Sequence, residues 1–132
     1  MRYLLDTNIC IYIIKRKPEQ VFRRFQRQRP GDIGISAITY SELCHGVANS
    51  ARPEQNQAAL AEFVAPLEVC DYPADASTAY GRIRAELRRH GKPIGPLDTL
   101  IAAHAVHLGV VLVTNDMTDF QRVSSLRVES WV

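Results

Sequence analysis

The chain has 132 residues and a formal net charge of +2, and 46% of its residues are hydrophobic while 23% are charged. This length and balance are typical of one globular domain that buries an ordinary apolar core. The longest apolar run, residues 9–14, is far shorter than the roughly 20 residues of a membrane-spanning helix, and no signal peptide is recognisable. We therefore expect a soluble cytoplasmic protein without a membrane segment.

The residues with soft ligand atoms do not form a zinc pattern. Cys10, Cys44 and Cys70 lie far apart among apolar neighbours, which favours buried reduced thiols over disulfides or zinc ligands. His104 and His107 share one face of a predicted helix but lack further soft ligands, so a buried or dimer-facing role is favoured for them.

Short apolar strands alternate with helical segments along the chain, and polar or Pro/Gly turns separate them. The helical pattern is clearest at 76–89, where apolar residues recur every three or four positions. The alternation predicts a single α/β domain over residues 1–132, with a mainly parallel central sheet flanked by helices on both faces. The expected strands are 4–5, 33–37, 67–71, 110–113 and an edge strand at 126–132; the expected helices are 9–14, one from residue 18, one after residue 37, and 58–65, 76–89, 98–108 and 117–122.

Four acidic residues stand near the ends of predicted strands or the starts of predicted helices. Asp6 and Asp116 directly follow apolar strands. Glu42 is expected in the first turn of the helix after the second strand, and Asp98 begins a helix after a loop that contains prolines. Because ligands bind beyond the carboxyl ends of parallel strands, we expect these four side chains to converge at one edge of the sheet.

Each of these acids also fits an ordinary capping or turn role. Thr39 and Glu42 have the spacing of a capping box, and the aspartates suit helix starts or turns. However, two carboxylates about 4 Å apart repel by roughly 4 kcal/mol at an effective dielectric of about 20. A protein that gathers several of them needs a cation or bound protons, and hard oxygen ligands select Mg²⁺ or Mn²⁺ over Zn²⁺.

A metal ion held by these acids would lower the pKa of a bound water and stabilise charge on a phosphate. Thr7, Thr114 and Asn115 are suitable to orient the carboxylates or that water. No Ser/His/Asp or Cys/His pairing is recognisable, and no G-x-x-x-x-G-K-[ST] phosphate loop is present. The pattern therefore favours metal-dependent hydrolysis of a phosphodiester without a protein nucleophile.

The rest of the chain is basic. The sequence has 14 acidic and 16 basic side chains, so the charge outside the four candidate acids is about +6. A basic body around an acidic site suits a polyanionic substrate. The candidate phosphate contacts, each of which fits a solvated helix face equally well, are Arg23, Arg24, Arg27, Arg29, Arg82, Arg84, Arg88, Arg89 and Lys92.

Four motifs that contain these acids follow one another along the chain: LLDTN at 4–8, SAITYSELxxG at 36–46, PLDxxIA at 96–102 and VTNDxxDF at 113–120. In this order they resemble the motifs of PIN domains, and more closely those of the VapC toxins of bacterial VapBC toxin–antitoxin pairs. The resemblance covers the whole chain. Each motif alone is weak, but four in order over one short chain are specific.

The resemblance implies that Asp6, Glu42, Asp98 and Asp116 form an acidic quartet. Asp6 and Asp98 would be the principal ligands of Mg²⁺, with Mn²⁺ as a substitute, and Glu42 and Asp116 would complete the site. Thr114 would be the supporting hydroxyl. Asp119 is a second candidate for the fourth position, for which we favour Asp116.

The resemblance also implies an activity and partners. It implies an endoribonuclease toxin that cuts RNA, most commonly tRNA, and so arrests translation. It further implies a homodimer, neutralisation by a cognate VapB-type antitoxin whose C-terminal tail covers the site, and a larger complex with that antitoxin on operator DNA.

Three alternatives stay open at this level. The chain could be a PIN-domain RNA-processing nuclease outside a toxin system, or an inactive PIN-like module that only captures RNA. A phosphoacceptor signalling domain is also a single α/β domain with acids and magnesium. That class needs paired acids after the first strand and a later lysine, whereas this chain has the single Asp6 and the run Thr114-Asn115-Asp116.

Overall fold

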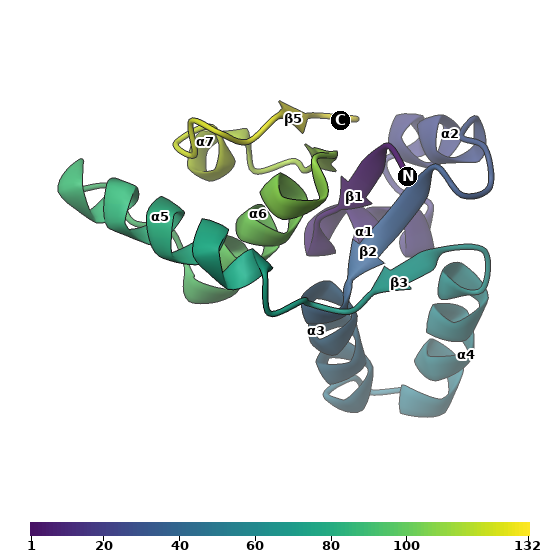
Figure 1. Ribbon diagram of the computed structural model, residues 1–132. Helices are drawn as coiled ribbons and strands as arrows, with labels where there is room; N and C mark the ends of the chain where they lie inside the picture. The colour runs from purple at the N-terminus through teal and green to yellow at the C-terminus, as the bar shows by residue number, and fades with distance from the viewer.

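The computed structural model describes all residues from 1 to 132, as alternating strands and helices in three layers (Figure 1). Neither a disulfide nor a helix long and apolar enough to cross a membrane is present. The strands are β1 (Tyr3–Leu5), β2 (Ile33–Ser36), β3 (Glu68–Cys70), β4 (Val111–Val113) and β5 (Val128–Glu129); the helices are α1 (Thr7–Lys15), α2 (Glu19–Gln26), α3 (Ala37–Ala48), α4 (Pro53–Val64), α5 (Ala76–Arg89), α6 (Pro96–Leu108) and α7 (Met117–Phe120).

The five strands form one parallel sheet in the order β3-β2-β1-β4-β5. Tyr3 of the central strand β1 pairs with Ile33 on one side and with Val111 on the other. The chain winds from β1 through β2 to β3, and later returns to add β4 and β5 on the opposite side. The winding therefore reverses between β1 and β4, and the carboxyl ends of these two strands flank the crevice where open α/β sheets bind ligands.

Helices cover both faces of the sheet, as the strand pattern requires. On β1, Tyr3 and Leu5 point to one face and Leu4 to the other, because successive side chains of a strand alternate. Tyr3 and Leu5 belong to a core that α1 to α4 complete, whereas Leu4 belongs to a core with α5, α6 and α7. Figure 1 shows these two groups of helices on opposite sides of β1. The predicted fold class is confirmed.

The ends of several elements differ from the prediction. Helix α4 begins at Pro53 and α6 at Pro96, because proline has no backbone N–H to satisfy and its fixed φ suits the first helical position. Asp98 therefore lies inside the first turn of α6 instead of opening it. The final strand is shorter than predicted, since only Val128 and Glu129 pair with β4.

The residue that anchors the C-terminus is Trp131, which is only 2% exposed. Its ring meets the Tyr3 ring edge-to-face, with 5.4 Å between the centroids. Its indole N–H donates to Glu129, which also forms an ion pair with Arg24. The last residues are thus held by side-chain packing beyond the end of the strand.

Candidate active site

Asp6 is the innermost acidic residue of the site. It follows β1 directly, its backbone N–H donates to the Val113 carbonyl over 2.8 Å, and its side chain is 4% exposed. One carboxylate oxygen, Oδ1, accepts from the Thr7 N–H at 2.8 Å, and the other, Oδ2, accepts from the Thr114 hydroxyl at 2.9 Å. Asp6 is therefore the N-cap of α1, as its sequence context suggests, and is fixed between β1 and β4.

Glu42 reaches the same site from α3. It lies in the second turn of this helix, where the Thr7 hydroxyl donates to its Oε1 over 2.8 Å. Ser36 is the N-cap of α3, since its Oγ accepts from the Ile38 N–H. The alternative role of Glu42 in a capping box with Thr39 therefore does not apply, and the predicted first-turn position of Glu42 is wrong. The Glu42 carboxylate points toward Thr7 instead of back to its own helix.

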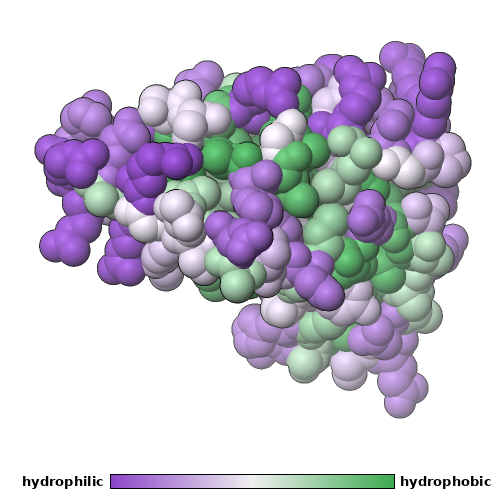
Figure 2. Space-filling model, viewed as in Figure 1, coloured by the Kyte–Doolittle hydropathy of each residue, from purple (hydrophilic) through white to green (hydrophobic).

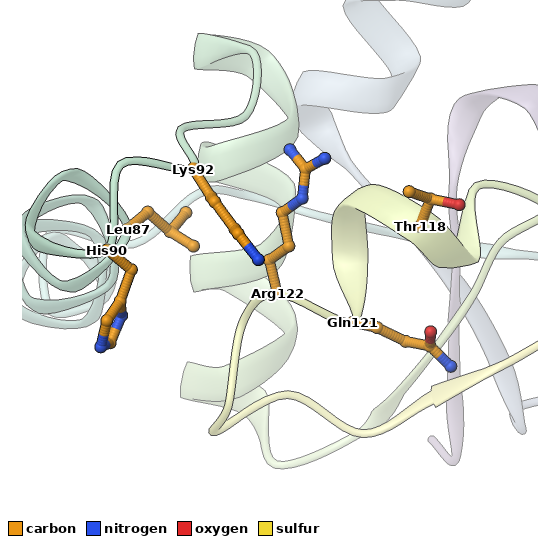
Figure 3. Close-up of a pocket in the computed structure, with 6 residues that line it drawn as sticks. All are labelled: Leu87, His90, Lys92, Thr118, Gln121 and Arg122. Atoms are coloured by element: carbon orange, nitrogen blue, oxygen red, sulfur yellow. The ribbon is translucent and has the colours of Figure 1, made fainter.

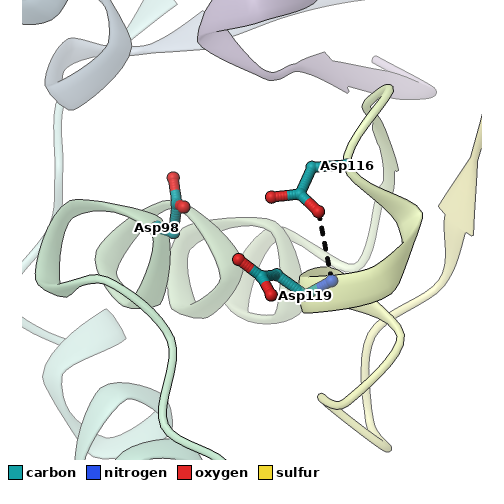
Figure 4. Close-up of side chains that lie close together, drawn as sticks. All are labelled: Asp98, Asp116 and Asp119. Carbon is teal, nitrogen blue, oxygen red and sulfur yellow. Dashed lines mark hydrogen bonds between the residues drawn. The ribbon is translucent and has the colours of Figure 1, made fainter.

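Three aspartates complete the acidic side of the site (Figure 4). Ligand oxygens of Asp98, Asp116 and Asp119 all lie within 4.8 Å of one another. Asp98 comes from the first turn of α6 and makes no capping hydrogen bond. Asp116 follows β4 and is the N-cap of α7, where its Oδ1 accepts from the Asp119 N–H at 3.2 Å. The sequence interpretation left open whether Asp116 or Asp119 stands at the fourth position, and the structure brings both to it.

The electrostatics of these carboxylates call for a cation. Burial, together with the charges of the surrounding acids, Asp6 first among them, raises the pKa of Asp98 from 3.8 to about 6. Burial also raises the pKa of Asp6, against the lowering effect of its hydrogen bonds from Thr114 and Thr7. A carboxyl group that resists ionisation beside other carboxylates is one whose charged form a bound cation would stabilise. The oxygen-only donor set of Asp98, Asp116 and Asp119 fits a hard divalent metal ion.

The predicted supporting residues divide into two kinds. Thr7 and Thr114 both contact acids of the site, and Thr114 Oγ1 also accepts from the Asp116 N–H at 2.9 Å. Asn115 makes no hydrogen bond to an acid of the site. Its Nδ2 donates to the Tyr12 hydroxyl at 3.0 Å, and its buried Oδ1 has no hydrogen-bond partner. The sequence interpretation did not include Tyr12, since only the folded chain brings α1 beside the end of β4.

No side chain beside the acids is a suitable nucleophile. Cys10 lies close enough for Asp6 to affect it, but burial and that negative charge raise its pKa well above the usual value, so the thiol stays protonated. His104 is fully buried, with Nδ1 2.8 Å from Ser36 Oγ, which confirms the buried role predicted for it. The acidic donor set fits a metal ion, which when bound would supply a water for hydrolysis of a phosphodiester bond.

Comparison with known proteins identifies the family of the chain. The PIN-domain family model matches residues 3–126. The tRNA(fMet)-specific endonuclease VapC of Shigella flexneri is 47% identical over 131 residues, which cover 99% of this chain and 98% of that protein. Ribonuclease VapC2 of Haemophilus influenzae is 44% identical over 132 residues, which cover 100% and 99% of the two chains.

Two solved structures of VapBC complexes have the same fold over the full length of this chain. VapBC2 from Rickettsia felis, bound to a DNA fragment from its promoter, superposes with a TM-score of 0.94 at 39% identity and covers 100% of both chains. DNA-bound VapBC from Salmonella typhimurium gives the same TM-score at 44% identity, covering 100% of this chain and 99% of that one. These matches leave no support for the phosphoacceptor alternative. The chain belongs to the PIN-domain family and, within it, to the VapC ribonucleases.

Proposed function

We propose that this protein is a Mg²⁺-dependent endoribonuclease toxin that hydrolyses tRNA and so inhibits translation in the cytoplasm. The observation that carries the proposal is the cluster of carboxylates near the crevice between β1 and β4. Ligand oxygens of Asp98, Asp116 and Asp119 lie within 4.8 Å of one another. Asp6 and Glu42 lie near enough for their charges to raise the pKa of Asp98. The full-length relative in Shigella flexneri supports tRNA as the substrate class.

In this proposal Asp6, Glu42, Asp98 and Asp116 hold Mg²⁺, which Mn²⁺ could replace. When bound, the metal ion supplies a water of lowered pKa and neutralises charge on the phosphate. Thr7 and Thr114 donate to the two oxygens of Asp6, which orients its carboxylate and favours its charged form. The remaining lone pairs of these oxygens stay available to a metal ion.

The two candidates for the fourth position differ in their partners. Asp119 forms an ion pair with Arg122, with 3.3 Å between Asp119 Oδ1 and Arg122 Nη1. Asp116 has no cationic partner, and one of its oxygens makes no hydrogen bond within the protein. We therefore assign Asp116 to the metal ion and give Asp119 a supporting role.

The partners in the proposal are a VapB-type antitoxin, a second copy of the chain in a homodimer, and operator DNA bound through the antitoxin. A groove of about 340 Å³ between α1, α3 and α4 supports the antitoxin contact. Six of its 11 lining residues are apolar, and Glu42 is one of the polar ones. An apolar segment of a partner bound there would end beside the acidic site. The complexes from Rickettsia felis and Salmonella typhimurium support such an assembly.

The test is cleavage of total tRNA by purified, antitoxin-free protein with Mg²⁺, with Mn²⁺ and with chelator. We expect discrete fragments that require metal and disappear in Asp6→Asn. Asp75→Asn is the matched control, because Asp75 is exposed and makes no capping hydrogen bond at the start of α5. If ribosomal RNA is cut and tRNA stays intact, the substrate is ribosomal RNA and not tRNA. RNA binding without cleavage under any metal condition would overturn the nuclease and favour an RNA-capturing module.

A further inference from the structure

A second groove, beside the acidic site, has a different chemistry from the groove between α1, α3 and α4. It has a volume of about 700 Å³ and lies between the end of α5 and α7 (Figure 3). Figure 2 shows that the end of the molecule where α5 terminates is almost entirely hydrophilic. Of the six residues that line the groove, only one is apolar. The six are Leu87, His90, Lys92, Thr118, Gln121 and Arg122.

Two cations from different segments face this groove. Arg122 follows α7, and Lys92 follows α5 (Figure 3). Lys92 is positioned by the way α5 ends: its N–H donates to the Leu87 carbonyl, and Gly91 adopts φ +66. A residue with a side chain is strained at that φ, so glycine is the suitable residue at this turn. The backbone conformation after α5 thus fixes the position of Lys92 beside the groove.

The groove is connected to the acidic site through Asp119 and Arg122. Asp119 belongs to the group of aspartates that fits a metal ion, and its ion pair with Arg122 spans 3.3 Å. The guanidinium of Arg122 also donates through Nη1 to the Pro93 carbonyl at 3.4 Å, which leaves its Nη2 and Nε without a partner in the protein. The groove with the two cations therefore adjoins the acidic site, since Arg122 follows Asp119 by three residues, about one helical turn.

We infer that this groove binds a phosphate of the RNA backbone that neighbours the phosphate being cut. The inference rests on the proposed function. Lys92 and Arg122 supply the charge that a phosphodiester requires, and Gln121 and Thr118 supply polar groups for phosphate or ribose oxygens. The acidic site repels RNA until a metal ion is bound, so adjacent cations are needed to hold the strand in place.

The lining favours RNA over a protein segment. Protein partners gain affinity from apolar or aromatic anchors in desolvated pockets, and Leu87 is the single apolar residue here and is only 3% exposed. Among the sequence-predicted phosphate contacts, only Lys92 lines this groove, where Arg122 accompanies it.

The test compares RNA binding by Lys92→Ala/Arg122→Ala with a charge-matched control, Lys17→Ala/Arg52→Ala. The control removes two exposed cations that line neither groove. All variants are made in an Asp98→Asn background, so that a labelled RNA containing the cleavage site is bound without being cut. Affinity is measured by fluorescence anisotropy over a range of salt concentrations. We expect several-fold weaker binding for the groove variant, with a salt slope reduced by about 1.4, or about 0.7 for each lost contact to a single strand.

Neutral methylphosphonate linkages, placed one at a time in the RNA, locate the phosphate. One neutral linkage beside the cleavage site should weaken binding to the Asp98→Asn protein but should not weaken binding to the groove variant further. Unchanged affinity and salt slope in the groove variant would overturn the inference. Weaker binding of the antitoxin, with RNA binding unchanged, would also overturn it and make the groove a protein contact. Metal-dependent cleavage by the unmodified protein, measured in parallel, tests the proposed function separately.

Discussion

The hydroxyl of Thr114 donates to Asp6 Oδ2 over 2.9 Å and so joins two residues that are 108 positions apart in the chain. Both side chains are buried at the carboxyl ends of adjacent strands. The same hydroxyl oxygen accepts from the Asp116 N–H. One threonine therefore holds the innermost carboxylate and the turn that carries Asp116, which makes it the most informative position to change.

Thr114→Val should weaken metal binding or activity by about 10- to 100-fold, the usual effect of losing a group that orients a metal ligand. Valine has a similar shape but cannot donate to Asp6 or accept from Asp116. The measurements are calorimetric titration with Mn²⁺ and kcat/KM for RNA cleavage. Thr114→Ser keeps the hydroxyl and should stay close to the unmodified protein. Equal metal affinity in the valine variant would contradict the role of this hydrogen bond.

The raised pKa of Asp98 should make the stability of the metal-free protein depend on pH. The pKa of Asp98 is about 6 in the folded chain, whereas a carboxyl group without these interactions has a pKa of 3.8. Between these two pH values the folded protein therefore binds more protons than the unfolded chain. This residue's contribution to the free energy of unfolding therefore falls as the pH rises through that window. Asp98→Asn should raise the Tm in chelator at about pH 7.5, and the gain should disappear at about pH 4.

Thermal unfolding with and without metal checks this expectation. Added metal should stabilise the unmodified protein at neutral pH by mass action and should stabilise Asp98→Asn much less. A stabilisation by Asp98→Asn that is equal at both pH values would show that burial and neighbouring carboxylates are not its cause.

The fourth acidic position can be resolved by comparing Asp116→Asn with Asp119→Asn. We expect the larger loss of kcat/KM, at least about 10-fold beyond that of the other variant, for Asp116→Asn, because its charge has no cationic partner in the protein. Asp119→Asn removes a charge that Arg122 already balances in part. The amide keeps an oxygen that can accept the capping hydrogen bond, so α7 is preserved in either variant. The reverse order of effects would move the metal ligand to Asp119.

Trp131→Ala should lower the free energy of unfolding by about 3 kcal/mol, since the ring is almost fully buried against Tyr3 and beside Arg24. Chemical denaturation measures the change. Val132→Ala is the control, because that neighbouring side chain is 58% exposed and should have little effect. A small effect of Trp131→Ala would mean that the chain after β5 is dispensable for stability.

The sheet could be predicted from the sequence because its central strands are continuous apolar segments buried on both faces, such as residues 111–113. The edge strands were harder to delimit. Residues 126–132 were predicted as one strand, but only Val128 and Glu129 pair, since beyond them packing of Trp131 determines the path of the chain. Such packing depends on Tyr3, far away in sequence, and leaves no local pattern.

The acidic site was predictable to the extent that it follows from strand ends. Asp6 and Asp116 lie where parallel strands finish, which the sequence indicates directly. Glu42 was predicted at the site, although its local spacing fits a capping box equally well. The contact that directs it there, the hydrogen bond from the Thr7 hydroxyl, was not predictable because it joins residues far apart in sequence. The ion pair between Arg24 and Glu129 was unpredictable for the same reason, because charges on separate elements leave no pattern in a single sequence.

The hydrogen bond from the Asp6 N–H to the Val113 carbonyl extends the ladder between β1 and β4 into the site itself. Asp6 is therefore tied to the central pair of strands, and we expect that it cannot move away without local unfolding of the centre of the sheet. Amide exchange at Asp6 should be as slow as global unfolding. We therefore expect an inhibitor of this enzyme to act by covering the site and not by distorting it, so that activity returns as soon as the inhibitor dissociates or is degraded.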